Sequence, residues 1–249
     1  MLILKPCGGR VVKLDCVTQS VTLNQEITLD RVGSVRGVAK GRLVGWTFAA
    51  AIGFGSILAV AASGESGSFP ASGQATCWNT GGQVIACAGT GQDGESQAGV
   101  PLAYRDNGDG TITDLNTGLM WEKLSNDGSI HDKDNYYTWT AAVSSKIAAL
   151  NSANYAGHND WRLPNIRQLR SIVNYGGTYP AISPAFNTGC SGGCSVLACS
   201  CTIWSGYWSS SAYAFCSPKG AWFVNFNDGN DNASYKTVNH YVRAVRGGS

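Results

Sequence analysis

Residues 155–164 read YAGHNDWRLP and separate two segments with helical spacing. Apolar residues recur on one face of segment 140–150, at Val143, Ile147 and Leu150. This spacing predicts a helix with one buried face. Pro164 suits the first turn of a second helix. The apolar stripe of that second helix is formed by Ile166, Leu169, Ile172 and Val173.

Short strands are predicted on both sides of the two helices. The turn-rich run 106–110 leads into the alternating segment 111–114, which is typical of a hairpin. A turn at 116–118 leads into an apolar strand at 119–121. Further strands are predicted after Pro184, at 207–210, 222–226 and 241–245. This order predicts an α+β domain over residues 100–249.

The N-terminal segment has the pattern of an export signal. Arg36, Lys40 and Arg42 precede an apolar run from 43 to 62 that ends in small residues. Residues 1–62 are therefore interpreted as a secretory signal peptide, with an uncleaved membrane anchor as the alternative. Residues 1–31 are interpreted as a mis-assigned start, the true start codon being one now read as Val32 or Val35. After cleavage the protein is predicted to be secreted, periplasmic or on the cell surface, without a membrane segment.

Charge and cysteine content separate the mature part from this leader. Residues 63–249 carry eleven Lys and Arg against thirteen Asp and Glu, so the mature chain has no basic surface for nucleic acid. Residues 63–99 are a Gly- and Ser-rich leader with a short Cys77–Cys87 loop. In an oxidising compartment most cysteines are expected to form disulfides. The candidates are Cys77, Cys87, Cys190, Cys194, Cys199, Cys201 and Cys216.

Several stretches, in this order, resemble the Lcl C-terminal domain family, which is named for a collagen-like bacterial adhesin. The matching stretches are 106–114, 117–121, 155–164, 207–210, 222–226 and 241–248. The leader, with Cys77, Cys87 and residues 89–94, is similar to the run that often precedes this domain. The segment 190–201 departs from the pattern as an insertion.

The resemblance implies a C-type-lectin-like fold, as found in surface and secreted bacterial proteins. In the named adhesin this domain is associated with sulfated glycans and trimeric assembly, so an extracellular glycan or protein ligand and a homo-oligomer are expectations here. Family membership alone does not transfer a ligand, because function depends on the site.

The segment 225–241 is the predicted binding surface. Amides and carboxylates can bond sugar hydroxyls, and Tyr or Trp rings can stack on a pyranose. Alternatively, the segment is a hairpin loop whose amides bond only backbone, and Trp222 is a core residue alternating with Val224 and Phe226. The predicted ligand-binding residues are Trp208, Trp222, Asn225, Asn227, Asp228, Asn230, Asp231, Asn232, Ser234, Tyr235, Asn239 and Tyr241.

Two other functions on the same fold remain open. The Asn- and Tyr-rich segment resembles the variable proteins of diversity-generating retroelements, which implies receptor binding. Formylglycine-generating enzymes share this architecture and use a copper-binding cysteine pair, for which Cys201 and Cys216 are the candidates. The rest of that family's active-site pattern is missing, so the protein is predicted not to be an enzyme.

Metal and catalytic motifs are weak. Asp106, Asp109 and Asp114 have the oxygen ligands that calcium prefers, but glycines occupy ligand positions of the usual loop, so a tight turn is favoured and no cofactor is expected. The four cysteines of 190–201 lack the paired spacing of a zinc site. Gly189 to Gly193 matches G-x-S-x-G in a loop context that does not suit a nucleophile elbow.

Structural roles are predicted for the remaining polar residues near these motifs. His131, His158 and His240 are far apart in sequence and are interpreted as surface or structural residues. Asp160 and Arg162, on either side of Trp161, are predicted to lock the second helix to the core.

Overall fold

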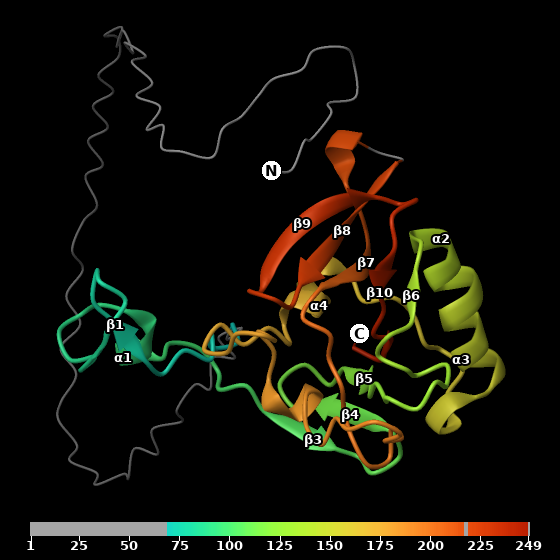
Figure 1. Ribbon diagram of the computed structural model, residues 1–249, viewed down its shortest axis with the longest axis horizontal. Helices are drawn as coiled ribbons and strands as arrows, with labels where there is room; N and C mark the ends of the chain where they lie inside the picture. Colours follow the sequence, from blue (N-terminus) through green and yellow to red (C-terminus); the bar gives the residue numbers. More distant parts are fainter. Residues whose placement is uncertain (1–68, 217–218, 249) are drawn as a thin grey trace, which may run out of the picture. The chain divides into compact units, whose positions relative to one another are not determined.

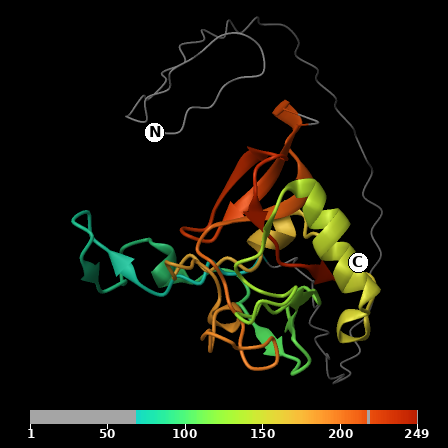
Figure 2. The same ribbon diagram turned by 45° about the vertical axis from the view of Figure 1, so that its right-hand side comes forward.

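The computed structural model describes residues 69–216 and 219–248. The predicted signal peptide and start codon lie outside the described residues. The described part is a mixed α/β structure, in which short antiparallel strands predominate and few residues are helical (Figures 1 and 2). In this part of the chain, no helix has the length and hydropathy needed to cross a membrane.

One sheet has four antiparallel strands, in the order β11-β5-β4-β3. The predicted hairpin at 106–114 is confirmed: Asp106 Oδ1 accepts from Gly108 N (2.9 Å) and Asp109 Oδ1 accepts from Thr111 N (3.0 Å). These bonds shape the turn between its first two strands. The strands are β3 (Tyr104–Asp106), β4 (Thr111–Asp114), β5 (Met120–Glu122) and β11 (Val245–Arg246).

A second sheet has five strands, in the order β6-β10-β7-β8-β9. Its neighbouring strands are antiparallel, except that β10 and β7 run parallel. In Figure 1 the edge strand β9 curves along the outside of β8 and β7. The strands are β6 (Tyr136–Tyr137), β7 (Gly206–Ala212), β8 (Gly220–Asn225), β9 (Asn230–Tyr235) and β10 (His240–Tyr241).

Two strand predictions need correction. Segment 241–245, predicted as one strand, is divided between β10 and β11, which belong to different sheets. The chain crosses from one sheet to the other at 242–244, where Val242, Arg243 and Ala244 are buried. Residues 230–235, predicted as part of a loop, form the strand β9, because their backbone pairs along the whole of β8.

The first predicted helix is confirmed as one continuous helical segment beside the sheets (Figure 1). Ile147 and Leu150 are buried as predicted, but Val143 is 43% exposed, and Ala142 and Lys146 are buried as well. A π-helical stretch widens the turn there and rotates the face that meets the core. The segment consists of α2 (Trp139–Ala141), η1 (Ala142–Ile147) and α3 (Ala148–Ser152), and the short 3-10 turn η2 (Tyr155–Gly157) follows it.

The second predicted helix is present as α4 (Ile166–Arg170), shorter than predicted. A capping box starts it: Asn165 Oδ1 accepts from Gln168 N, and Gln168 Oε1 accepts from Asn165 N. Ile172 and Val173 are buried as predicted, but they lie beyond the end of the helix. The helix packs against β7 and β8.

The predicted locking residues bind two different elements. Arg162 donates to Gln168 Oε1 at 2.8 Å and so holds the start of α4, as predicted. Asp160 instead accepts from Arg246 Nε at 2.7 Å, which ties the loop before Trp161 to β11. The tie to the helix is therefore confirmed for Arg162 alone.

Within residues 69–216 and 219–248, three disulfides stabilise the loops. The predicted Cys77–Cys87 bridge is confirmed and joins β1 (Cys77–Trp78) to the loop that follows β2 (Val84–Ile85), ahead of the short helix α1 (Asp93–Ser96). In the insertion, Cys190 pairs with Cys201 and Cys194 with Cys199. These bridges close the loop between the turn η3 (Pro184–Phe186) and β7. Cys216 ends the turn η4 (Ala214–Cys216), and its side chain is outside the described atoms.

Candidate ligand-binding surface

The β8–β9 hairpin, at one edge of the five-stranded sheet, places the predicted binding residues in space. Its turn is held by Gly229 N, which donates to Asn225 O at 2.8 Å. Gly229 has a φ of +81°, and a Cβ there would meet Val173 Cγ1 at 2.7 Å, so only glycine fits. The turn is therefore rigid and packed on the core, and it fixes the position of β9.

The pairing register assigns the side chains of β9 to two faces of the sheet. Asn232 lies opposite Phe223 and Asn230 opposite Asn225, on one face. Asp231 lies opposite Val224, on the other face, where its carboxylate pairs with Arg170 at 3.3 Å. We call the side chains of residues 225–235 the hairpin surface. Its exposed polar members are Asp228, Asn230, Asp231, Asn232 and Tyr235.

Several of these side chains bond locally, as the loop alternative predicted. Asn225 Oδ1 accepts from Asn227 N at 3.0 Å, and Asp228 Oδ1 accepts from Asn230 N at 3.1 Å. Asn230 Nδ2 donates to Asp228 Oδ2 at 2.7 Å, and Asn232 Oδ1 accepts from Ala233 N. These bonds fix the amides and carboxylates in place without burying them. A fixed, exposed polar group loses little conformational entropy when a ligand binds.

Trp208 was wrongly predicted to lie on the binding face. Its side chain has no exposed surface, and its indole Nε1 donates to Tyr137 O at 2.9 Å in the core. The strand β7 is covered on both faces, since its neighbour Tyr207 is also fully buried. Trp208 therefore stabilises the fold.

The other predicted residues lie in β8, in β9 and at or just before β10, and β7 separates β10 from the hairpin. Trp222 is half-buried and meets the ring of Tyr213 edge-on, with centroids 5.1 Å apart. Tyr241 is half-buried beside Tyr207, and Ser234 is half-buried in β9. Asn239 is exposed in the turn before β10. Trp222 is thus neither fully exposed nor a core residue.

Two exposed aromatic residues beside the hairpin were not predicted. Tyr179 and Trp204 are 62% and 57% exposed, and their rings meet at right angles with centroids 5.4 Å apart. Tyr179 N donates to Asn227 O at 3.3 Å, so the pair lies next to the hairpin turn. The two residues are 25 positions apart in the chain, and no local pattern in the sequence brings them together.

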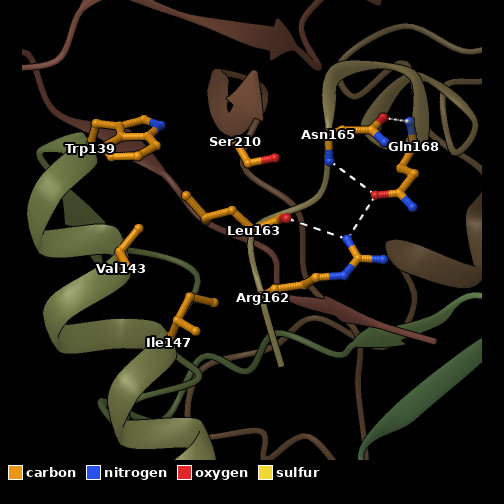
Figure 3. A pocket seen from close by; sticks show the side chains of 8 residues that line it. All are labelled: Trp139, Val143, Ile147, Arg162, Leu163, Asn165, Gln168 and Ser210. Carbon is orange, nitrogen blue, oxygen red and sulfur yellow. Dashed lines mark hydrogen bonds between the residues drawn. The ribbon is translucent and has the colours of Figure 1, made fainter. Parts of the chain in front are cut away.

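The helical segment formed by α2, η1 and α3 is called the long helix below. A hollow lies between this helix and the segment before α4 (Figure 3). This groove has a volume of about 460 Å³. One wall is apolar, and the other end carries Arg162, which is already bonded to Gln168 Oε1 and to Gly247 O. Its lining is Trp139, Val143, Ile147, Arg162, Leu163, Asn165, Gln168 and Ser210. Arg162, the one cation in this lining, already donates hydrogen bonds to other residues of the domain. The groove therefore presents fewer free polar groups to a ligand than the hairpin surface does.

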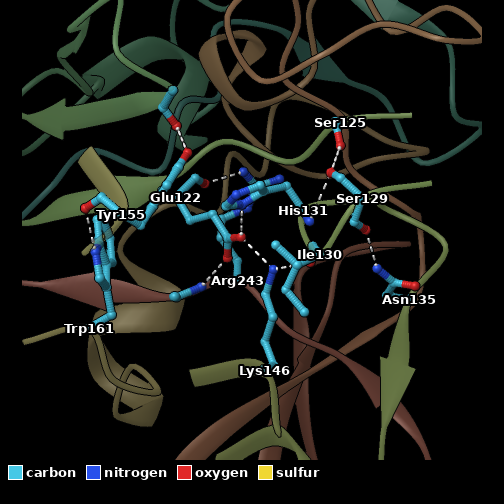
Figure 4. Close-up of polar contacts among 12 residues, drawn as sticks. Glu122, Ser125, Ser129, Ile130, His131, Asn135, Lys146, Tyr155, Trp161 and Arg243 are labelled. Carbon is cyan, nitrogen blue, oxygen red and sulfur yellow. Dashed lines mark hydrogen bonds and ion pairs between the residues drawn. The ribbon is translucent and has the colours of Figure 1, made fainter. Parts of the chain in front are cut away.

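One group of charged side chains is buried and has a structural role (Figure 4). Glu122 is fully buried and accepts from Lys146 Nζ, from His131 Nδ1 at 2.7 Å and from Ala244 N at 3.1 Å. Burial raises the pKa of Glu122, but the charges of Lys146 and His131 outweigh that effect and hold the pKa below its ordinary value. Arg243 donates to Glu122 O at 2.8 Å. This ionic cluster joins both sheets to the long helix.

The motifs considered for metal and catalysis have structural roles. Among the described residues, the one close group of three possible metal ligands is Cys190, Cys194 and Cys201, and all three are in disulfides. The pairing of Cys201 with Cys190 also argues against its role as a copper ligand. Ser191, of the G-x-S-x-G match, lies in this disulfide loop, which connects η3 to β7 without a strand-to-helix turn.

The carboxylates of Asp106, Asp109 and Asp114 all have hydrogen-bond or ion-pair partners within the domain. Lys123 Nζ donates to Asp106 Oδ2 at 2.6 Å, and Thr117 Oγ1 donates to Asp114 Oδ2 at 2.7 Å. Asp109 Oδ1 accepts from Thr111 Oγ1 at 2.6 Å. The predicted tight turn is confirmed.

One family of known proteins matches this chain. The model of the Lcl C-terminal domain matches residues 110–246, which is more than half of the 249 residues. The chain belongs to the Lcl C-terminal domain family. The resemblance seen in the sequence motifs is thereby confirmed. The matched range includes both sheets' central strands, the ionic cluster and the whole hairpin surface. A search of curated proteins found no match.

In this Lcl C-terminal domain, His240 lies between two aromatic rings beneath the hairpin. It stacks on Phe223 with centroids 4.3 Å apart and meets Trp208 at 4.4 Å. Burial lowers the pKa of His240 to about 4, and its Nε2 is buried without a hydrogen-bond partner in the described residues. The folded domain therefore holds a neutral imidazole at pH 7.

This neutral histidine predicts a pH dependence of stability. As the pH falls from about 6.5 towards 4, the unfolded chain gains a proton at His240 that the folded domain does not take up, so the free energy of unfolding decreases. Urea unfolding at pH values across this range measures the slope. The variant His240→Gln is expected to show a smaller slope, whatever its stability at pH 7. An unchanged slope in the variant would assign the pH dependence to other groups.

Proposed function

We propose that this Lcl C-terminal domain is an exported adhesion module that binds a glycan through the hairpin surface and catalyses no reaction. The observation that supports it is the set of exposed polar groups of the hairpin surface: the amides of Asn230 and Asn232 share one face of the edge strand β9, and the carboxylate of Asp228 lies in the turn before it. Sugar hydroxyls bond well to such groups, which present both donors and acceptors. Loops and edges on a rigid scaffold commonly carry binding sites.

Other features support export and a lectin-like role. Three disulfides in the described residues fit an oxidising compartment. Two sheets joined by a buried ionic cluster, with a helix beside them, are compatible with the C-type-lectin-like fold that the family implies. Binding without metal is part of the proposal, since the carboxylates of Asp106, Asp109 and Asp114 are engaged in turns.

A glycan array probed with the exported protein tests this proposal. Binding is expected, and EDTA should leave it unchanged. The double variant Asn230→Ala with Asn232→Ala removes two exposed amides. At about 0.5–1.5 kcal/mol for each of two lost hydrogen bonds, it should bind roughly 5- to 150-fold more weakly.

The matched control is Asn159→Ala, which removes an exposed amide from the loop before Trp161. This variant should bind like the unmodified protein, and all three proteins should unfold at similar temperatures. Full binding by the double variant would move the site away from the hairpin. Binding to no glycan, with capture of a protein receptor instead, would contradict glycan recognition.

A further inference from the structure

The pair Tyr179 and Trp204 is an exposed aromatic surface with a fixed geometry. More than half of each side chain is accessible, at 62% and 57%. The rings lie at 89° to each other, so one ring can lie flat beneath a ligand while the other stands at its side. Large aromatic rings held in solvent expose apolar area that folding normally removes, and such patches often mark binding sites. We call this pair the aromatic platform.

Backbone hydrogen bonds hold the platform against the hairpin turn. Ala181 N donates to Phe226 O at 2.7 Å, and Phe226 N donates to Ser205 O at 2.9 Å. The two loops that carry Tyr179 and Trp204 are thus attached to opposite sides of one hairpin residue. The platform is preformed, because neither loop depends on a ligand for these contacts.

Tyr179 adopts a backbone conformation that is costly for its residue type. Its φ is +54°, in the left-handed region that bulky residues rarely occupy. Such strain persists only where surrounding contacts enforce it, and it is concentrated at functional sites. Here the strained residue is also the more exposed member of the platform.

Polar groups surround the platform on the hairpin side. Asn227 is bonded to Tyr179 through its backbone, and the exposed carboxylate of Asp228 follows it in the turn. An apolar ring face next to amide and carboxylate groups matches a pyranose, which has one face of C–H groups and an edge of hydroxyls. A hollow of about 320 Å³ begins at the next residue, Pro180, and leaves room for a further sugar unit.

The charges at this turn select against acidic sugars. Asp228 and Asp231 are both in the hairpin, and the neighbouring cation Arg170 pairs with Asp231 at 3.3 Å. These three groups together carry a net negative charge. A sulfate placed on the platform would therefore be repelled, whereas an uncharged sugar would keep all its hydroxyl contacts.

From these observations we infer that Tyr179 and Trp204 form a stacking subsite for an uncharged pyranose of an oligosaccharide, with Asn227 and Asp228 bonding its hydroxyls. This inference rests on the proposed glycan binding and adds a position and a ligand class to it. An uncharged pyranose differs from the sulfated glycans associated with the adhesin for which the family is named.

The test is a titration of the exported protein with neutral hexose and N-acetylhexosamine oligosaccharides and with the same oligosaccharides bearing sulfate. Neutral ligands should bind at least tenfold more tightly than their sulfated forms. Trp204→Ala should weaken binding of the neutral ligands about tenfold or more, and Trp204→Phe should weaken it less. Tyr136→Ala, which removes an aromatic ring that is 59% exposed at the opposite edge of the sheet, should leave binding unchanged.

The results of this titration distinguish failure of the inferred subsite from failure of the proposed glycan binding. Equal or tighter binding of sulfated ligands would overturn the inferred ligand class. If Trp204→Ala binds normally while Asn230→Ala with Asn232→Ala does not, the hairpin binds glycan and the platform is not a subsite. If none of these variants changes glycan binding, both proposals fail. Because Trp204 is more than half exposed, its replacement should not unfold the domain, and the melting temperature checks this.

Discussion

Replacing Glu122 by glutamine is expected to lower the free energy of unfolding by about 3–5 kcal/mol. The substitution removes the buried negative charge that faces Lys146 and leaves that ammonium, which is 1% exposed, without its counter-ion. An uncompensated charge in the interior costs far more than a broken surface ion pair. Urea unfolding at pH 7 measures the effect.

A double variant separates charge from packing in this cluster. Glu122→Gln with Lys146→Met removes both charges and should be less destabilised than the sum of the two single variants. The pKa of Glu122 also predicts acid sensitivity. Because it is lower in the folded state than its ordinary value of 4.5, the stabilisation is complete above that pH and is lost as the pH falls below it. Two results would contradict this explanation. One is a double variant whose loss of stability equals the sum of the losses in the two single variants, and the other is a Glu122→Gln variant whose stability falls at low pH as steeply as that of the unmodified protein.

Replacing Trp161 by alanine is expected to destabilise the domain by about 3–5 kcal/mol, as is typical for removal of a buried tryptophan. Trp161 is 2% exposed, its Nε1 donates to Tyr155 O at 3.0 Å, and its backbone exchanges two hydrogen bonds with the side chain of Asn151. It therefore fixes the long helix to the segment that begins α4. Thermal and urea unfolding measure the loss.

The milder variant Trp161→Phe keeps an aromatic ring but loses the Nε1 hydrogen bond, so its destabilisation should be smaller. A loss below about 1 kcal/mol in Trp161→Ala would mean that the cavity closes by rearrangement. The motif around Trp161 would then be less important for the fold than its position in the core indicates.

The local elements of this fold were largely predictable. Turn residues such as Asp106 and Asp109 act through nearby backbone, so their effect is visible in a short window of sequence. Pro164 correctly indicated that a helix follows, although it precedes the N-cap Asn165 and does not lie in the first turn as predicted. The family resemblance was visible for the same reason, since its motifs are runs of neighbouring residues. The cysteine spacing likewise indicated short disulfide loops.

The errors arise where tertiary pairing overrides local pattern. Residues 230–235 are polar and lack the alternation of a half-buried strand, yet pairing with β8 makes them one. Trp208 and its neighbour Tyr207 point to opposite faces of β7, and both are buried because this central strand is covered on both faces. A sequence pattern alone does not distinguish such a strand from one with an exposed aromatic face.

The candidate site was only partly predictable for a related reason. The hairpin segment could be proposed from its composition, because its Asn, Asp and Tyr residues are consecutive. Tyr179 and Trp204 come from separate loops and meet only in the folded domain. The same holds for Glu122, Lys146 and Arg243, whose charges are distant in the chain and buried together. Contacts between distant segments of the chain cannot be predicted from the residue pattern of a short stretch of sequence.

An NMR titration would locate the glycan on the hairpin surface and the aromatic platform. The ¹⁵N-labelled exported protein would be titrated with a neutral oligosaccharide selected on the array, while backbone amides and tryptophan indole N–H signals are followed. We expect the largest shifts at the indole of Trp204 and at residues 227–232. Shifts concentrated at Trp139 and Val143, in the groove beside the long helix, or no specific shifts at saturating ligand, would contradict this expectation.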